Sequence, residues 1–417
     1  MEFGERKPTT NNPISQKQRQ MKRYKSFLLH TIIMLCVAFA FTACSDDNAN
    51  DTTPTDQEYV EGILKKMSLR EKVGQMFWIR PEYLIEKIAS GEVKPSTKEW
   101  PSYNVTSITS EMKALDDEYP AGGVILFAHN CVEPQQLKTF VSQIKELKNS
   151  PLLCIDEEGG RVARLANNEA FGLNKYTSMT WLCQNGGAPT VYNAANYIGS
   201  YLKDYGFDVD FAPVSDVNSN PDNPVIGVRA FSSDPDSVAM MVCSYLDGLS
   251  ANGITGCIKH FPGHGDTKTD THLGYAETLK TWDDMLKCEM IPFKAGIKHG
   301  VETIMTAHIT APNVDGSNVP STLSSIILQD KLRKELGYNN IIVTDAMEMG
   351  AITDQYAPED AAVKSIQAGV DVVLCIHSYK KAFNAVVEAV NTGAISEERI
   401  NESVRRILLV KKKHGKI

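Results

Sequence analysis

The chain has 417 residues, of which 42% are hydrophobic and 23% charged, and its formal net charge is −8. Residues 1–43 carry seven Lys or Arg and two Glu, so residues 44–417 have a net charge of −13. This acidic balance argues against nucleic acid and against an anionic membrane surface as partners. The length is enough to bury one large core, although it is also compatible with two domains.

The first informative segment is a predicted export signal. Three cations precede an apolar run at residues 27–41, and small residues lead from it to Cys44. A basic start followed by a short apolar stretch is typical of a secretory signal. The cysteine at the break favours a bacterial lipoprotein with Cys44 as the lipid attachment residue; an uncleaved membrane anchor is the alternative. The signal begins near Met21, so we interpret residues 1–20 as an over-extended start.

Three regions are therefore expected. Residues 1–43 combine the over-extended start with a lipoprotein signal peptide, residues 44–55 form a flexible acidic tether, and residues 56–417 form the folded domain. The tether is too polar to pack, and it resembles the tags that follow the lipid cysteine in surface-exported lipoproteins of some Gram-negative bacteria. We expect an exported protein that is lipid-anchored through Cys44 in the Gram-negative outer membrane, with the cell surface as an open alternative to the inner face.

Seven cysteines follow Cys44, and they are scattered, odd in number and without a C-x-x-C pair. This pattern argues against a zinc site and against a disulfide framework. It predicts that most of them are buried small hydrophobes. The seven are Cys131, Cys154, Cys183, Cys243, Cys257, Cys288 and Cys375.

Eight short apolar runs alternate with longer amphipathic stretches. Near-continuous apolar strands that are each followed by a helix indicate a parallel sheet covered by helices. Eight units favour a closed α/β barrel of the (β/α)8 TIM type over an open doubly wound sheet. No G-x-G-x-x-G follows any strand, which argues against dinucleotide binding. The expected strands are 73–79, 123–127, 152–155, 208–212, 256–260, 303–307, 341–344 and 371–376, and the expected helices are 134–147, 190–205, 236–252, 286–299, 323–336, 358–368 and 382–392.

The connection after the first strand is unusually long. It covers residues 80–119 and contains one helical stretch near 108–115. In barrels of this type the loops after the strands lie on the catalytic face, so this connection is expected to shape a substrate groove. The chain closes with a basic amphipathic helix that opens at Ser396.

Charged or titratable side chains follow four of the expected strands. They are Asp156, the Lys259–His260 pair, His308 and Asp345. In barrel enzymes, residues at the carboxyl ends of the strands do the chemistry. A single buried Asp in such a place is more often a helix cap or a structural hydrogen-bonding group. Four groups that converge on one rim argue against that interpretation for all of them.

The loop from Lys259 to His272 is the richest in chemistry. Its three His and two Asp would suit a metal, but their spacing matches no standard zinc pattern and Lys259 repels a cation. A proton-transfer pair is favoured, in which Asp270 holds the imidazole of His272 and stabilises its charged form. Asp345 at the end of a buried strand, facing such an acid/base, is the arrangement that glycoside hydrolysis needs. No metal and no cofactor is expected.

The same loop resembles one found in a known family. KHFPGHGDT at residues 259–267 and DTH at 270–272 closely resemble the segment that marks bacterial β-N-acetylhexosaminidases of glycoside hydrolase family 3. The resemblance extends over nearly all of residues 56–417 and implies a single (β/α)8 glycoside hydrolase barrel there. Further matching segments, in family order, are 67–76, 122–127, 155–162, 211–217, 225–231, 305–308 and 343–347.

The resemblance also implies roles for individual residues. Asp345 matches the nucleophile that forms a covalent glycosyl-enzyme, and His272 matches the acid/base that Asp270 supports. A His/Asp pair separates the family's N-acetylglucosaminidases from its β-glucosidases, which generally take their acid/base from outside the barrel. We therefore expect a retaining, exo-acting β-N-acetylglucosaminidase that removes terminal β-linked GlcNAc. The residues expected to bind the terminal sugar are Asp156, Arg164, Arg229, Lys259 and His260, with His308 as a further candidate.

Two departures and several alternatives stay open. Thr271 stands where the family more often has Ser, and LGYA at residues 273–276 replaces a Leu-Pro ending, which bears on leaving-group preference. Single-barrel members that recycle cell-wall fragments are usually cytoplasmic, whereas an export signal is predicted here. Alternative functions are a β-glucosidase or broad β-hexosidase, a GlcNAc phosphorylase of the same family, and a non-catalytic surface glycan-binding lipoprotein. The glycan is open among peptidoglycan fragments, chitin oligosaccharides and host glycans, and a monomer is expected.

Overall fold

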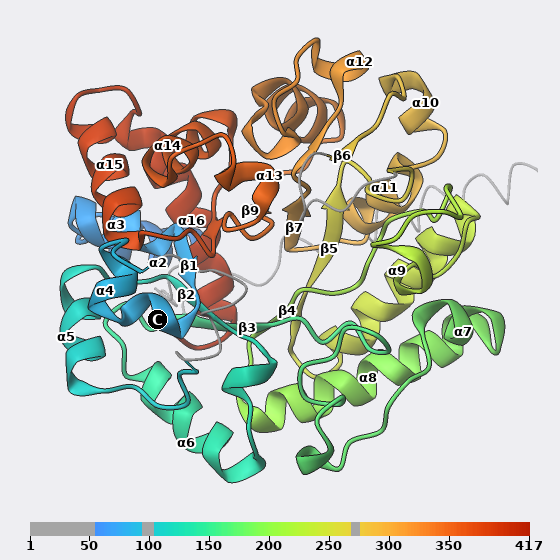
Figure 1. Ribbon diagram of the computed structural model, residues 1–417, viewed down its shortest axis with the longest axis horizontal. Coiled ribbons are helices and arrows are strands. Elements are labelled where there is room, and N and C mark those ends of the chain that lie inside the picture. Colours follow the sequence, from blue (N-terminus) through green and yellow to red (C-terminus); the bar gives the residue numbers. More distant parts are fainter. Residues whose placement is uncertain (1–54, 94–103, 268–275) are drawn as a thin grey trace, which may run out of the picture. The chain divides into compact units, whose positions relative to one another are not determined.

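The computed structural model describes residues 55–93, 104–267 and 276–417. In this part of the chain eight parallel strands are joined in the order β10-β1-β2-β3-β4-β5-β7-β9 (Figure 1). A parallel bridge between Val343, in β9, and Val372, directly before β10, joins the two ends of the sheet. The sheet is therefore a closed barrel, which confirms the predicted (β/α)8 architecture.

The barrel strands are short and completely buried. Burial of every strand residue is expected for a parallel sheet that is covered by helices outside and filled by side chains inside. A separate two-stranded parallel sheet pairs β6 (Ala276–Glu277) with β8 (Ile309–Thr310). The barrel strands are β1 (Phe77–Ile79), β2 (Gly123–Leu126), β3 (Leu152–Ile155), β4 (Val209–Asp210), β5 (Thr255–Phe261), β7 (Thr303–Thr306), β9 (Ile341–Thr344) and β10 (Val373–Leu374).

Helices surround the barrel on its outside (Figure 1). The α-helices are α2 (Asp56–Leu64), α3 (Leu69–Gln75), α4 (Glu86–Ala89), α5 (Ser110–Glu118), α6 (Pro134–Lys145), α7 (Met179–Gln184), α8 (Gly187–Tyr205), α9 (Pro235–Ser250), α10 (Trp282–Leu286), α11 (Met290–Lys298), α12 (Pro312–Asp315), α13 (Gly350–Thr353), α14 (Pro358–Ala368), α15 (Tyr379–Asn391) and α16 (Glu397–Lys413). Short 3-10 turns are η1 (Pro81–Leu84), η3 (Ala128–Asn130), η4 (Glu169–Phe171), η5 (Gly227–Arg229) and η6 (Ser321–Leu323), and η7 (Ile326–Glu335) is a π-helix.

The first strand is shorter than the predicted segment 73–79. Ser68 and Glu71 form a capping box, in which the Ser68 hydroxyl accepts from the Glu71 N–H and the Glu71 carboxylate accepts from the Ser68 N–H. This box opens helix α3, which continues to Gln75, and β1 begins only at Phe77. The prediction was wrong for residues 73–75 because a short apolar run does not distinguish a buried helix from a buried strand.

Several predicted helices differ from the structure by up to three residues at their ends, and two differ in continuity or in helix type. The segment 286–299 is interrupted, because α10 ends at Leu286 and α11 begins at Met290. The segment 323–336 starts later, at Ile326, and takes π geometry, in which the Leu336 N–H donates to the Lys331 carbonyl. Neither difference changes the order of the barrel elements.

All seven cysteines after Cys44 are free thiols in the structure, and four of them, Cys131, Cys154, Cys257 and Cys375, are buried. The prediction of small buried hydrophobes is confirmed for this majority. Among the described helices, none combines the length and the apolar character that a bilayer crossing requires. Cys44, the tether up to residue 54, and the predicted pair Asp270 and His272 lie outside the described residues, so the statements about them stay predictions.

Candidate active site

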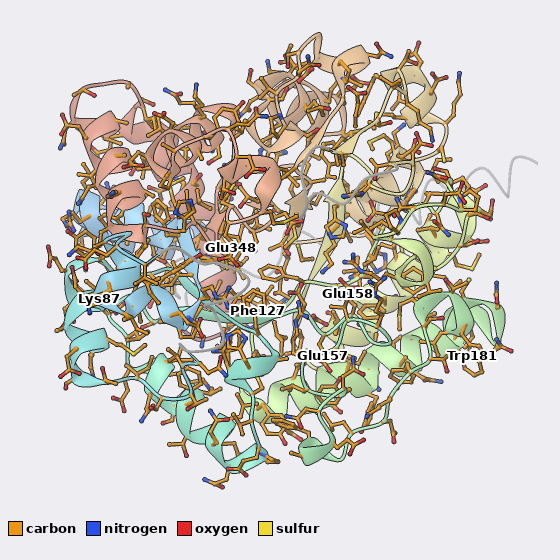
Figure 2. All side chains as sticks on the ribbon, viewed as in Figure 1. Lys87, Phe127, Glu157, Glu158, Trp181 and Glu348 are labelled. Atoms are coloured by element: carbon orange, nitrogen blue, oxygen red, sulfur yellow. The ribbon has the colours of Figure 1, made fainter. Side chains whose placement is uncertain are left out.

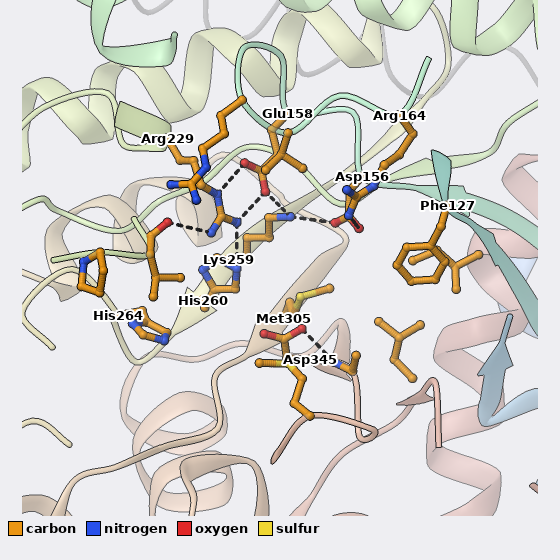
Figure 3. Close-up of a pocket in the computed structure, with 18 residues that line it drawn as sticks. Phe127, Asp156, Glu158, Arg164, Arg229, Lys259, His260, His264, Met305 and Asp345 are labelled. Atoms are coloured by element: carbon orange, nitrogen blue, oxygen red, sulfur yellow. Dashed lines mark hydrogen bonds and ion pairs between the residues drawn. The ribbon is translucent and has the colours of Figure 1, made fainter. Parts of the chain in front are cut away.

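A pocket of about 330 Å³ lies at the carboxyl ends of the barrel strands (Figure 3). Six of the residues predicted from sequence line it together: Asp156, Arg164, Arg229, Lys259, His260 and Asp345. The strands explain the convergence, because Asp156 follows β3, Lys259 and His260 belong to β5, and Asp345 follows β9. The other lining residues are Ile125, Phe127, Glu158, Arg161, Val162, Pro224, Val225, His264, Met305, Ala346, Met349 and Leu374.

Lys259 is the centre of a charged network on one wall of the pocket. Its ammonium nitrogen lies 2.9 Å from Asp156 Oδ1 and 2.6 Å from Glu158 Oε1, and only 2% of its side chain is exposed. Arg164 Nη2 donates to the second oxygen of Asp156 at 3.0 Å. Arg229 donates two hydrogen bonds to the Glu158 carboxylate, from Nε at 2.9 Å and from Nη2 at 2.7 Å. Figure 3 shows Lys259 between the two carboxylates.

This network fixes the charge states of its members. Burial alone would raise the pKa of Asp156, but the charges of Lys259 and Arg164 outweigh it and hold that pKa well below its usual range. For the same reason Arg229 and Lys259 overcome burial and lower the pKa of Glu158 to about 2. Burial favours neutral Lys259, yet Asp156 and Glu158 raise its pKa above the ordinary value. At neutral pH this wall therefore presents fixed, alternating charges.

His260 is oriented by a buried carboxylate that the sequence analysis did not single out. Asp216 lies 2.7 Å from His260 Nδ1, and its other oxygen accepts the backbone N–H of His264 at 2.6 Å. The Nε2 atom of His260 faces Arg229 Nη2 at 3.4 Å. Burial would raise the pKa of Asp216, but the two histidines lower it, so this carboxylate is ionised. Asp216 therefore holds both histidines against the pocket.

Asp345 stands opposite this wall. Its backbone N–H donates to the Thr306 carbonyl at 3.0 Å, which fixes it at the junction of β7 and β9. Its Oδ1 accepts the N–H of Ala346 at 2.7 Å. Figure 3 shows the carboxylate beside Met305, projecting into the pocket that Lys259 and His260 line from the other side. A carboxylate in this place can approach one face of a bound ring.

His308 occupies a different place from the other predicted residues. It is fully buried and is not among the residues that line the pocket. Its Nδ1 lies 2.9 Å from the Thr322 hydroxyl and its Nε2 lies 3.0 Å from the Ala346 carbonyl. The contact seen for His308 is therefore with the turn that carries Asp345. Its predicted sugar contact stays a prediction.

The long connection after β1 contacts the same turn from the side. Tyr83 and Arg80 both donate to the carboxylate of Glu348, three residues after Asp345, and the Arg80 bond is 2.8 Å. None of its described residues, 80–93 and 104–119, lines the pocket. Within the described residues, this connection supports the Asp345 loop and does not form the pocket wall.

Glu157 and Glu158 are neighbours with opposite roles. Figure 2 shows both over the ends of the strands near the centre of the molecule. Glu158 faces the pocket, whereas Glu157 accepts the backbone N–H groups of Arg164, Leu165 and Ala166 and the Tyr201 hydroxyl. Glu157 therefore shapes the loop that carries Arg164. The signal for Glu158 was available in the sequence, because residues 156 and 158 share one side of an extended segment.

The geometry defines a class of protein. A barrel pocket at the low end of the size range for small ligands, lined by fixed cations and carboxylates, suits a polyhydroxylated ring. Each hydroxyl of such a ring both donates and accepts hydrogen bonds, so it can bind the carboxylate and the cation of one pair at once. The apolar wall around Phe127 and Met305 suits the C–H faces of the same ring. The pocket is thus that of a sugar-binding barrel with one carboxylate, Asp345, set apart from the binding network.

Comparison with known proteins gives the family. Residues 68–410 match the glycosyl hydrolase family 3 N terminal domain, and the chain belongs to this family. The chain is 34% identical over 335 residues to "Beta-hexosaminidase A" of Pseudoalteromonas piscicida, which covers 74% of this chain and 56% of the relative. It is 32% identical over 296 residues to "Beta-hexosaminidase" of Stenotrophomonas maltophilia, covering 70% and 87%. The resemblance noted from sequence is confirmed.

A solved structure supports the same assignment. The glycoside hydrolase family 3 beta-N-acetylglucosaminidase from Paenibacillus sp. str. FPU-7 superposes with a TM-score of 0.75 at 34% identity, covering 84% of this chain and 63% of that one. The chain thus spans less than two thirds of the length of this protein and of the Pseudoalteromonas relative.

Proposed function

We propose that the protein is a retaining, exo-acting β-N-acetylglucosaminidase that hydrolyses terminal β-linked GlcNAc from oligosaccharides or peptidoglycan fragments. The observation that carries the proposal is the separation of roles in the pocket. The carboxylates Asp156 and Glu158 are paired with cations, which suits binding, while Asp345, which matches the family nucleophile by sequence resemblance, stands across from them. The names of the relatives, which are hexosaminidases and an N-acetylglucosaminidase, support the choice of sugar.

The proposed reaction proceeds in two displacements. Asp345 attacks the anomeric carbon while His272 protonates the leaving oxygen, which breaks the glycosidic bond and forms a glycosyl ester on Asp345. His272, now neutral, removes a proton from water, which attacks the same carbon and releases Asp345. Asp270 holds the imidazole of His272 and stabilises its charged form. No cofactor takes part, and the two inversions give a product of retained β configuration.

The pocket also supports exo action. Its volume suits one ring, and the wall formed by Lys259 and Glu158 is almost completely buried, with side-chain exposures of 2% and 1%. A chain end can enter such a pocket, whereas an internal sugar would need an exit on both sides. The terminal ring therefore fills the pocket, and the remainder of the bound substrate extends out through the mouth of the pocket.

The decisive experiment combines a substrate panel with stereochemistry. The purified protein is assayed on nitrophenyl β-GlcNAc, β-glucoside and β-xyloside with and without phosphate, and proton NMR follows the first-formed sugar. We expect release of β-GlcNAc, no dependence on phosphate and little turnover of the other glycosides. Initial α-anomer would contradict the covalent mechanism, sugar phosphate would indicate a phosphorylase, and preference for glucoside would indicate a β-glucosidase. No turnover with measurable glycan binding would indicate a non-catalytic binding protein.

We further propose that the protein is exported and lipid-anchored at Cys44 in the Gram-negative outer membrane. The support is the basic, apolar and small-residue sequence that precedes Cys44 and the polar tether that follows it. Stable anchoring needs more than one acyl chain on that residue. Cys44→Ser should move the activity from the membrane pellet to the soluble fraction. Activity that stays in the pellet would indicate an uncleaved anchor, and a soluble cytoplasmic wild type would rule out export.

A further inference from the structure

Arg161 lines the pocket and has no counter-charge among the described residues. Arg164, Arg229 and Lys259, the other three lining cations, are each engaged with Asp156 or Glu158. The side chain of Arg161 makes no ion pair and no hydrogen bond with the described residues, and it is exposed. It therefore lies at the mouth of the pocket, above the buried network.

The lining as a whole carries an excess of positive charge. It contains four cations, Arg161, Arg164, Arg229 and Lys259, against three carboxylates, Asp156, Glu158 and Asp345. Burial lowers the pKa of His264, so that side chain adds no charge at neutral pH. The chain, in contrast, has a net charge of −8. Asp216, which is ionised behind His260 and His264, offsets this excess for the pocket as a whole, so the positive charge that favours an anionic ligand is local to Arg161.

The backbone that carries Arg161 is held in place. Gly159 and Val162 form an antiparallel bridge around it, and Asn167 Nδ2 donates to the Gly160 carbonyl at 3.1 Å. Gly160 has a φ of 64°, and a Cβ there would lie 2.9 Å from the Ser178 Cα, so the turn packs directly against the segment before α7. A fixed backbone reduces the entropy that Arg161 loses on binding.

We infer that Arg161 binds a carboxylate on the sugar that follows the terminal GlcNAc, and so selects substrates whose leaving group is anionic. The inference rests on the proposed function, because the terminal GlcNAc is itself neutral and any negative charge must lie beyond the scissile bond. Arg161 is exposed at the mouth through which that part of the substrate leaves. Its planar guanidinium can bind a carboxylate with two parallel hydrogen bonds.

Two chemical sources provide such a carboxylate. One is the lactyl group of N-acetylmuramic acid, and the other is the carboxylate of a uronic acid. Paired substrates separate them: GlcNAc-β-(1→4)-N-acetylmuramic acid and GlcNAc-β-(1→4)-glucuronic acid, each compared with its own methyl ester. The ester removes the charge and leaves the rest of the disaccharide unchanged. The readout is the ratio of kcat/KM for acid over ester, in which any general loss of activity cancels.

The wild type should prefer the acid over the ester about fivefold to tenfold in one of the two pairs, and raised ionic strength should reduce this preference. Arg161→Gln and Arg161→Ala should bring the ratio to about one, and Arg161→Lys should give an intermediate value. Lys203→Ala is the matched control. It removes one exposed positive charge from the last turn of α8, away from the pocket lining, and should keep the wild-type ratio.

A wild-type ratio of one in both pairs, or a ratio that survives in Arg161→Gln, would overturn the inference. Inorganic phosphate is the remaining oxyanion; if phosphate accelerates the wild type and not Arg161→Gln, Arg161 binds phosphate and the carboxylate assignment is wrong. Binding of acid and ester to Asp345→Asn, measured by calorimetry with and without Arg161→Gln, applies the same ratio test without turnover. If the protein hydrolyses neither substrate but still binds the acid more tightly than the ester, the proposed function is wrong and the role of Arg161 is supported.

Discussion

Two buried ion-pair networks lie at opposite ends of the barrel, and both pair buried carboxylates with arginines. At the carboxyl end, Asp156 and Glu158 meet Lys259, Arg164 and Arg229 around the pocket. At the amino end, directly before β10, Asp371 meets three arginines and a serine: Arg333, Arg399, Arg406 and Ser403. In both networks burial alone would raise the pKa values of the carboxyl groups, but the neighbouring cations lower them.

The two networks differ in how far their carboxylates are exposed to solvent. Asp371 is 0% exposed, and its oxygens are shared among the arginines, Ser403 and the Ile342 N–H. Its partners come from η7 and α16, so the network fastens these elements to the barrel. Asp156 keeps 14% of its side chain exposed, at the wall of a cavity. Strand polarity separates the two cases, since catalytic groups in this fold lie at the carboxyl ends and stabilising groups at the amino ends.

The largest effect that follows from this comparison is expected at Asp345. Asp345→Asn keeps the shape and the acceptor for the Ala346 N–H but removes the nucleophile. We expect kcat to fall below about 1% of wild type, with a melting temperature close to wild type. Steady-state kinetics and a thermal scan on the same preparation measure both. A variant that retains several per cent of the activity would exclude Asp345 as the nucleophile.

His272→Ala should separate substrates by their leaving groups. Substrates that need a proton on the leaving oxygen should slow by about 10²- to 10⁴-fold. Activated aryl glycosides need much less help in the first step and should slow less in that step. Pre-steady-state kinetics on a nitrophenyl glycoside and on a natural disaccharide measure the contrast. Equal slowing of both would mean that His272 positions the sugar or the loop.

Asp371→Ala tests the amino-end network and should act on stability alone. Three arginines would lose their buried counter-charge, so the free energy of unfolding should fall by about 3–5 kcal/mol. The kcat of the folded fraction should stay at the wild-type value. Glu402→Ala is the control, because it removes a 3.8 Å pair between Arg399 and a half-exposed carboxylate, a contact expected to contribute below about 1 kcal/mol. A loss of kcat in folded Asp371→Ala would contradict the assignment of catalysis to the carboxyl end and of stability to the amino end.

Sequence patterns predicted the barrel well because its strands are buried on both faces and therefore read as apolar runs. They failed at residues 73–75, where the capping box of Ser68 and Glu71 determines a helix within such a run. They identified Asp345 and Lys259 because charged residues directly after apolar strands are conspicuous. They did not assign Asp216, whose role depends on a contact with His260 across 44 residues. They named Arg164 through the family resemblance but gave no role to Arg161, because its lack of a partner among the described residues is visible only in the structure.

The amino end also contains a lysine that differs from the network around Asp371. Lys411 of α16 is 0% exposed, and its ammonium nitrogen donates to the Asn149 carbonyl at 2.6 Å. Burial, together with the charge of Lys416, lowers the pKa of Lys411 to about 7, although Asp208, Asp116 and Cys154 act in the opposite direction. In the unfolded chain this group keeps the ordinary lysine pKa near 10.4. The folded state therefore releases a proton that the unfolded state holds.

The last prediction, which concerns only the pH dependence of stability, follows from that difference. Between about pH 7.5 and 10 the unfolded state binds one more proton at Lys411, so this residue makes the folding stability rise with pH by about 1.4 kcal/mol per unit. Lys411→Met removes this term. The free energy of unfolding of Lys411→Met should exceed that of the wild type by the largest amount at or below pH 7, and this difference should shrink steadily up to pH 10. Other groups titrate in the same range, including the buried thiols, but they are common to both proteins and cancel in the difference.

Urea unfolding of both proteins at several pH values measures this difference in stability, with Lys412→Met as the control for loss of a lysine from α16. A difference that stays constant with pH would show that Lys411 is charged in the folded protein, and activity per folded molecule should remain unchanged throughout.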